Sequence, residues 1–176
     1  MHTQRIAARV AARAHVDVAV ALASGFLGTL AMTIIMYVLP ALGISQVELP
    51  IWVARLFVRD AAHAAALGLA LHVLVGSAYA LLYAFRIEPR LKVRAAYGGL
   101  MLGLGLWAFA QAVAVPLLGA IAAAGGTGDG PGFLALNLGA SAAVASLLAH
   151  LAYGVAVALA YGCHAGAACG DRVQEF

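Results

Sequence analysis

Charged residues are scarce in this 176-residue chain, where Lys, Arg, Asp and Glu together make up 10% of the sequence. Soluble globular domains carry about 25% charged residues, so the chain lacks the charge that a water-facing surface needs. The charges are also confined to short stretches, because residues 18–47, 61–85, 95–128 and 130–170 contain none. The shortage excludes an ordinary soluble domain.

Signature motifs of common enzymes are missing as well. The sequence has no GxxxxGK, HExxH or GxSxG motif and no paired carboxylates in its apolar runs, which argues against known hydrolytic and phosphoryl-transfer chemistry. Its two cysteines, Cys163 and Cys169, flank His164 at a spacing that does not match a zinc site. We therefore expect two free thiols and no metal; whether the protein is an enzyme stays open, and the sequence leans against it.

The four uncharged runs are each long enough for one membrane crossing. A helix needs about 20 apolar residues to cross the hydrocarbon core, and it satisfies its backbone hydrogen bonds internally. The polar–apolar alternation of a membrane β-strand is missing from these runs. We predict an all-α integral membrane four-helix bundle, a single membrane domain over residues 1–176, with spans at about 18–39, 62–85, 95–122 and 133–162.

Basic residues flank the predicted spans unevenly. Only Arg55 and Arg59 lie between the first two spans, whereas the two tails and the loop after the second span hold Arg5, Arg9, Arg13, Arg86, Arg90, Lys92, Arg94 and Arg172. The positive-inside rule then predicts that both termini are cytoplasmic. The Ala- and Arg-rich composition fits a bacterial inner membrane. The basic residues that orient the spans account for the net charge of +3. We therefore expect the lipid bilayer as the partner, and not nucleic acid. A homo-oligomer and a larger membrane complex are further options.

The segment 44–60 differs from the spans that surround it. Pro50 suits a first helical turn, and apolar side chains are interspersed with Arg55 and Arg59, which lie one turn apart. This mixture predicts a short amphipathic helix on the outer membrane surface. Trp52 is expected to anchor it at the level of the lipid headgroups.

The second and fourth spans resemble each other. Residues 69–84 (LALHVLVGSAYALLYA) align without gaps to residues 147–162 (LLAHLAYGVAVALAYG), and a His-x3-Gly-x6-Tyr frame is shared. LPALG (39–43) and VPLLG (115–119) relate the first and third spans more weakly. We interpret the chain as two parallel-repeat helical hairpins, about 18–85 and 95–162, related by a pseudo-twofold axis along the membrane normal. Coincidence in an Ala-rich chain is the alternative.

Each repeated span has a face of small residues with one histidine in it. Residues four apart share a helix face, which aligns His72 with Gly68 and Gly76, and His150 with Ser146 and Gly154. Small residues allow membrane helices to approach closely, and the third span adds another such pair in Gly99 and Gly103. We therefore expect both imidazoles to face protein and not lipid, and an ionisable residue inside the membrane is a functional hypothesis by default.

Three interpretations of the histidines stay open. In the first, they are neutral and hydrogen-bond across helices as part of a polar interior, with no cofactor. In the second, His72 and His150 ligate one b-type haem. In the third, they line a proton or small-solute path, although acidic residues usual in proton relays are missing from the spans. The other polar residues that we assign to such an interior are Gln111, Asn137, Tyr83 and Tyr161.

Several segments also resemble a known group of proteins. GFLGTLAMT (25–33), HVLVGSAYALLYA (72–84), the Trp107…Pro116-x2-Gly119 frame and AHLAYGVAVALAYG (149–162) resemble the small uncharacterised prokaryotic membrane proteins that include the YagU-like inner-membrane family and a related domain of unknown function. The resemblance implies a multi-span membrane protein and supplies no substrate or catalytic residue. Our leading expectation is a non-enzymatic structural or accessory membrane subunit; the alternatives are a permease-like oligomer and a haem-binding redox subunit.

Overall fold

The computed structural model describes residues 16–43, 49–91, 93–126 and 130–164, which form helices and turns without a β-strand. Four of the described helical segments are long and apolar enough to cross a membrane. The all-α prediction is confirmed for this part of the chain. The basic residues of both tails, together with Lys92 and Cys169, lie outside it, as does the Cys163 side chain.

The helices follow the predicted spans with adjustments at their ends. The first is α2 (Val18–Ala41), and the second is α4 (Ala61–Leu82), which a π-helical turn η1 (Tyr83–Ile87) and a 3-10 turn η2 (Glu88–Arg90) extend. The third is α5 (Ala95–Phe109), which continues through a π-helical segment η3 (Ala110–Ala114) into α6 (Val115–Ala124). A short helix α3 (Leu49–Ala54) lies in the first connection.

The fourth helix begins later than the sequence predicts. Residues Phe133–Leu138 form the 3-10 segment η4, and α7 spans Ala140–His164. Leu134 and Ala135 have φ angles of 53° and 56° inside η4, and Gly139 has a φ of 94°. These left-handed conformations interrupt the α-helical hydrogen-bond ladder, so the predicted start at residue 133 is corrected to Ala140.

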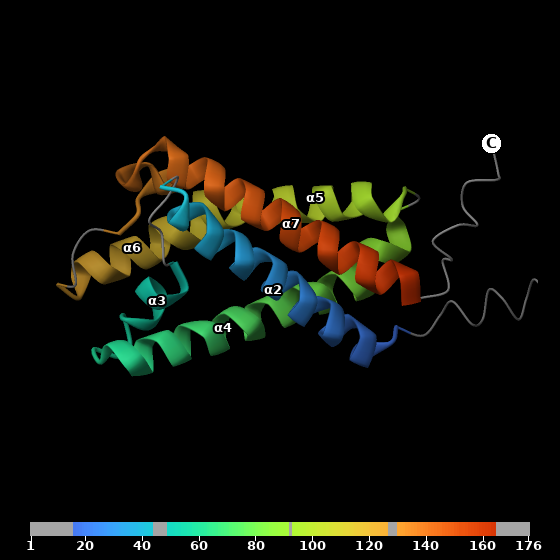
Figure 1. Ribbon diagram of the computed structural model, residues 1–176, viewed down its shortest axis with the longest axis horizontal. Helices are drawn as coiled ribbons and strands as arrows, with labels where there is room; N and C mark the ends of the chain where they lie inside the picture. The colour runs from blue at the N-terminus through green and yellow to red at the C-terminus, as the bar shows by residue number, and fades with distance from the viewer. Residues whose placement is uncertain (1–15, 44–48, 92, 127–129, 165–176) are drawn as a thin grey trace, which may run out of the picture.

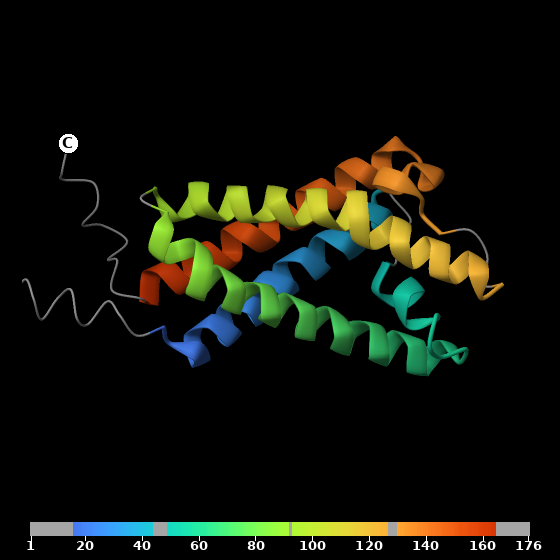
Figure 2. The ribbon, with the colours of Figure 1, turned by 180° about the vertical axis from the view of Figure 1, so that it is seen from behind.

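Two central helices organise the bundle. Helix α2 packs along α7, while α4 packs on α2 and α5 packs on α7 (Figure 1). In the described residues, α4 has no comparable packing with α5 or α6, and Figure 2 shows these helices diverging towards the end that holds α3. The bundle is therefore closed on three sides and open on the fourth.

This open side departs from the predicted pseudo-twofold arrangement. The proposed repeat exchanges α2 with α5 and α4 with α7, so it maps the tightly packed α2–α7 pair onto the α5–α4 pair. The two hairpins do form packed pairs, α2 with α4 and α5 with α7. The two pairs do not assemble symmetrically. Helix α2 packs on α7, whereas the equivalent helices α5 and α4 do not pack on each other.

Glycines set the close approach of α5 to α7. A Cβ atom added to Gly99 would lie 2.5 Å from the carbonyl oxygen of Gly154, and one added to Gly103 would lie 2.8 Å from Cα of Leu151. Real Cβ atoms do not come this close to backbone atoms, so the two helices pack backbone against backbone. This is the close contact that small residues in membrane helices were expected to provide.

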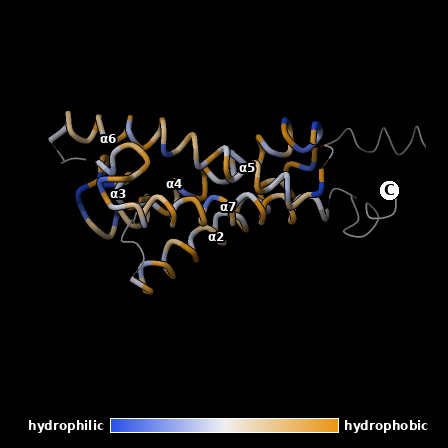
Figure 3. Tube along the Cα trace, turned by 90° about the horizontal axis from the view of Figure 1, so that it is seen from above, coloured by the Kyte–Doolittle hydropathy of each residue, from blue (hydrophilic) through white to orange (hydrophobic). Residues whose placement is uncertain are grey.

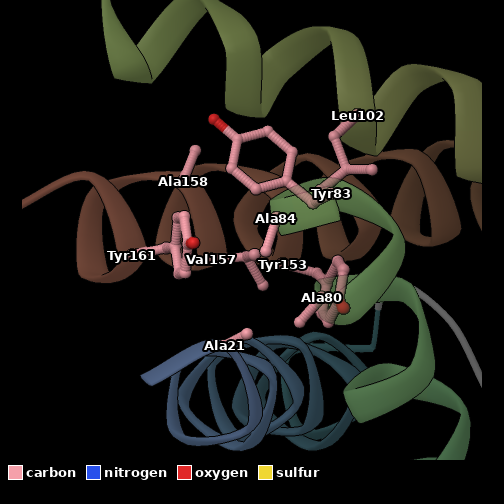
Figure 4. Close-up of a cluster of buried hydrophobic side chains, with 9 residues drawn as sticks. All are labelled: Ala21, Ala80, Tyr83, Ala84, Leu102, Tyr153, Val157, Ala158 and Tyr161. Atoms are coloured by element: carbon pink, nitrogen blue, oxygen red, sulfur yellow. The ribbon is translucent and has the colours of Figure 1, made fainter. Parts of the chain in front are cut away.

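A compact core fills the end of the bundle at which α2 begins and α7 ends, which we call the side of the termini. Figure 4 shows that its side chains come from all four long segments: Ala21, Ala80, Tyr83, Ala84, Leu102, Tyr153, Val157, Ala158 and Tyr161. The rings of Tyr83 and Tyr161 meet edge to face, with centroids 6.4 Å apart and planes at 89°, an arrangement that the aromatic quadrupoles favour. This ring contact joins η1 to α7 at this end.

Helix α3 packs against α4 at the opposite end of the bundle. A Cβ atom on Gly68 of α4 would lie 2.6 Å from the carbonyl oxygen of Pro50, so α3 and α4 are in direct backbone contact. Trp52 is only partly exposed, and its ring lies beside Gly130, where an added Cβ would approach it to 3.1 Å. The predicted short helix is therefore present over Leu49–Ala54, and its position on the outer membrane surface stays a prediction.

Hydrophilic residues gather at the two ends of the bundle, with mostly apolar stretches between them (Figure 3). At the start of α4, the carboxylate of Asp60 accepts a hydrogen bond of 3.0 Å from the backbone N–H of His63. This hydrogen bond, with a second one to the His63 ring, lowers the pKa of the Asp60 carboxyl because both favour its charged form. The cap fixes where the second long helix begins.

Candidate functional site

The open side of the bundle contains a cavity of about 340 Å³. Its walls come from α2, α3, α4, α7 and the continuous α5–η3–α6 segment. Leu71 and Val75 of α4 face Leu106 and Leu118 of the α5–α6 segment across it. We call this cavity the lateral cleft, since it lies between the two helical segments that do not pack on each other.

The lateral cleft is apolar and carries no formal charge. None of its lining residues is Lys, Arg, Asp or Glu. Its polar side chains are few and come from three helices: Thr29 of α2, His72 and Tyr79 of α4, and His150 and Tyr153 of α7. An apolar hollow with a few convergent polar groups is the usual character of a small-molecule site.

The cleft ends within the bundle on the side of the termini. Tyr153 is 3% exposed, and its hydroxyl donates a hydrogen bond of 2.5 Å to the carbonyl oxygen of Gly76. Beyond this bond lies the packed core described above, which includes Tyr83, Val157 and Tyr161. The cleft is therefore closed towards the termini.

His150 is held by a polar chain that links α5–α6 to α7. Its Nδ1 lies 2.7 Å from the carbonyl oxygen of Ser146, one turn earlier on the same helix. The hydroxyl oxygen of Ser146 accepts a hydrogen bond of 2.7 Å from Nε2 of Gln111. These contacts fix the rotation of the imidazole, and His150 is one of the residues that line the cleft.

A π-helical segment brings Gln111 into this chain of polar contacts. Gln111 lies in η3 and is 1% exposed. Pro116 follows at the start of α6; it has no N–H, and its ring clashes with the carbonyl oxygen four residues earlier in a regular α-helix. A π-helical turn accommodates such an interruption and is often found at functional sites. It allows the third span to continue past Pro116.

A second, smaller cavity of about 40 Å³ adjoins the same polar chain. Gln111, Ser146 and His150 line it together with apolar residues of α2 and α7. The Oε1 atom of Gln111 is buried there without a hydrogen-bond partner in the described structure. The cavity exceeds the roughly 10–15 Å³ of probe-occupied volume that one water molecule needs.

His72 is the second imidazole that lines the lateral cleft. It is partly buried, and its Nε2 has no hydrogen-bond partner among the described residues. A buried polar atom without a partner is unusual in a folded protein and needs an explanation. The His72 side chain lines the cleft, but Nε2 itself has almost no accessible surface, so a bound molecule contacts this atom only after the ring turns.

The structure brings together only part of the polar interior that the sequence predicts. His72 and His150 share the cleft, and Gln111 joins them through Ser146. Asn137 lies elsewhere: it is exposed in η4 and donates to the carbonyl oxygen of Gly130. Tyr83 and Tyr161 also lie apart from the histidines, in the core near the termini.

Sequence reasoning missed Tyr153 and the polar role of Ser146. Tyr153 lies three residues after His150 and Ser146 four residues before it, so helix periodicity places all three on one face. The spacing carries this signal, whereas Ser146 taken alone resembles a small packing residue. The described residues contain no group of three or more His, Cys, Asp and Glu side chains able to hold a metal ion.

Comparisons with known proteins place the chain in a family without assigning it a role. No curated protein and no solved structure matches it. The model of the DUF6789 family, described as a family of unknown function, matches residues 15–171, which include all four long helical segments. The chain therefore belongs to the DUF6789 family.

Proposed function

We propose that this protein is a multi-pass integral membrane protein that binds an apolar small molecule in its lateral cleft, as a non-enzymatic accessory subunit. The observation that carries the proposal is the uncharged cavity of about 340 Å³ between α4 and α5–α6, lined by both histidines. Its volume lies in the range of about 300–1,000 Å³ that small-molecule sites occupy.

The membrane part of the proposal rests on helix length and composition. Four helical segments have mean hydropathies of 1.8 to 2.1 over their most apolar windows, and large apolar side chains are exposed along them, such as Phe26, Leu74 and Leu104. Lipid is the solvent that suits such surfaces. The basic residues and the YagU-like resemblance support four crossings of a bacterial inner membrane with both termini cytoplasmic.

A reporter fused to the C-terminus tests this orientation. We expect green fluorescent protein fused after Phe176 to fluoresce in bacterial cells, and alkaline phosphatase fused at the same point to stay inactive, because only the cytoplasm keeps that phosphatase reduced. A phosphatase fused in the 125–132 loop, on the opposite side, is the matched positive control. Strong phosphatase activity from the C-terminal fusion contradicts the proposed topology.

Binding is favoured over permeation because the cleft is closed at one end. A solute path has to reach both sides of the membrane, whereas the Tyr153–Gly76 hydrogen bond and the core beyond it close the cleft towards the termini. The open side lies between two spans, where an apolar molecule has direct access from lipid. We therefore propose entry from the bilayer and not from water.

Filling the cleft is expected to abolish binding. The probe is 1-methoxynaphthalene, a small neutral apolar molecule, added to purified protein in detergent micelles. At a concentration of about 100 times its Kd, it should raise the Tm of the parent protein by about 5–10 °C. Ala114 lines the cleft, so we expect the Ala114→Phe variant to lose this rise.

Ala120→Phe provides the control for this experiment. Ala120 lies on α6 and is exposed outside the cleft, so the same added volume should leave the probe-induced rise in Tm unchanged. Equal responses of the two variants would show that the probe acts through the micelle or another surface. The proposed binding site would then be rejected.

A b-type haem is a second candidate, because two imidazoles line one cavity. Their Nε2 atoms make no hydrogen bond to described residues, and the Nδ1 contact of His150 with a backbone carbonyl is of the kind that orients metal-ligating histidines. The uncharged lining offers no cationic partner for the two haem propionates. A Soret band in protein purified after haem supplementation, lost in His72→Gln and His150→Gln, would favour haem.

A further inference from the structure

The contacts of His150 determine which hydrogen-bonding role remains for its other nitrogen. A carbonyl oxygen can only accept a hydrogen bond, and the Ser146 carbonyl oxygen lies 2.7 Å from Nδ1. Nδ1 must therefore carry a proton. The Ser146 hydroxyl oxygen lies farther from Nδ1, at 3.5 Å, so the closer carbonyl contact decides where the proton sits.

The ring is expected to be neutral, which makes Nε2 an acceptor. No carboxylate lines either cavity that His150 borders, and a buried cation without a counter-charge is strongly disfavoured. A neutral imidazole with its proton on Nδ1 has a lone pair on Nε2. No described residue donates a hydrogen bond to that lone pair.

We propose that the lateral cleft selects apolar molecules that carry a hydroxyl group, with the hydroxyl donating its hydrogen bond to Nε2 of His150. This inference rests on the proposed function and narrows its ligand class. Phosphate and carboxylate headgroups are disfavoured, because the cleft has no Lys or Arg to compensate their charge. Ether, ester and ketone groups accept but do not donate, so they would leave the Nε2 lone pair without a partner.

His72 adds a second reason for a hydroxyl group. Its Nε2 is buried without a partner in the described structure, and it lines the same cleft. A hydroxyl oxygen accepts hydrogen bonds as well as donating one. After a turn of the His72 ring, a hydroxyl group can accept from a protonated Nε2 of His72 as well as donate to Nε2 of His150, whereas a group that only accepts leaves His150 without a donor.

Matched pairs of probes test the inference in detergent micelles. The first pair is 1-naphthol and 1-methoxynaphthalene, and the second is 1-tetradecanol and its methyl ether. After correction for partition into micelles, we expect the hydroxyl compound of at least one pair to bind about tenfold more tightly than its ether. The pair with the larger preference tells whether a phenolic or an aliphatic alcohol is the better source of the hydroxyl.

A His150→Phe variant should bind both members of a pair equally, because it keeps an aromatic ring and loses the acceptor. If this variant does not fold, ¹⁵N spectra of histidine-labelled parent protein provide the second measurement. They should show an unprotonated Nε2 on His150 whose resonance moves when the hydroxyl probe is added and not when its ether is added. A proton on Nε2 in the free protein would overturn the inference.

Failure of the inference and failure of the proposed function give different results. If no probe of either pair binds the parent protein, the cleft is not a binding site and both proposals fail. If hydroxyl and ether bind equally in both pairs, while Ala114→Phe still abolishes binding, the cleft binds apolar molecules but His150 does not select a hydroxyl. That second result rejects this inference alone.

Discussion

Replacing Gly103 by valine is expected to separate α5 from α7 and to destabilise the protein by about 3 kcal/mol or more. The added side chain would meet the carbonyl oxygen of His150 and Cα of Leu151. Backbone atoms in the middle of a helix cannot move aside as a flexible side chain does, so the whole helix pair has to shift. The same shift would displace His150 and deform the cleft.

Gly105→Val is the matched control for this prediction. Gly105 lies on the same helix, and a Cβ atom there would meet nothing within 4 Å. We expect its unfolding free energy to change by no more than about 0.5 kcal/mol, measured by equilibrium unfolding in mixed micelles. If the two variants are equally stable, the backbone-to-backbone contact of α5 with α7 is contradicted.

Replacing Tyr153 by alanine is expected to cost about 3–5 kcal/mol of unfolding free energy. The Tyr153 ring fills the space between α2 and α4, where a Cβ atom added to Gly28 would lie 3.0 Å from it and one added to Gly76 would lie 3.4 Å from it. Alanine would leave a void among three helices and remove the closed end of the cleft. Equilibrium unfolding in mixed micelles measures the loss.

Two further variants separate the contribution of the Tyr153 ring to the unfolding free energy from that of its hydroxyl group. Tyr153→Phe keeps the ring and loses the hydrogen bond to Gly76, so we expect a smaller loss of about 1 kcal/mol. Tyr97→Ala removes the same side chain from a position that is 60% exposed and should have little effect. A loss in Tyr153→Ala no larger than in Tyr97→Ala would show that this ring does not join the helices.

The long helices were predictable because their signal is local. Uncharged stretches long enough to cross a bilayer adopt the α-helix, which satisfies their backbone hydrogen bonds internally. Charged residues, Pro and Gly mark the interruptions between them. Asp60 begins α4 with a side-chain cap, as its position before an apolar run suggests. The inward direction of His72 and His150 also followed from a local feature, the spacing of small residues along one helix face.

Two local features had no recognisable sequence signal. Residues 133–138 are apolar like the helix that follows, yet Leu134 and Ala135 adopt left-handed backbone conformations there, which L-residues with a Cβ seldom do. The related segments LPALG (39–43) and VPLLG (115–119) also adopt different backbone structures. Helix α2 ends one residue after Pro40, whereas a π-helical segment precedes Pro116 and the third span continues to Ala124.

The sequence by itself determined four apolar helices, their approximate limits and the inward faces of the two histidines, because these properties depend on composition and on spacing along a single helix. Only the tertiary structure decided which small-residue faces pair. The closed α2–α7 contact, the open α4–α5 side and the position of α3 arise from competition among several similar faces. The outcome depends on backbone contacts between distant segments, which no spacing within one segment encodes.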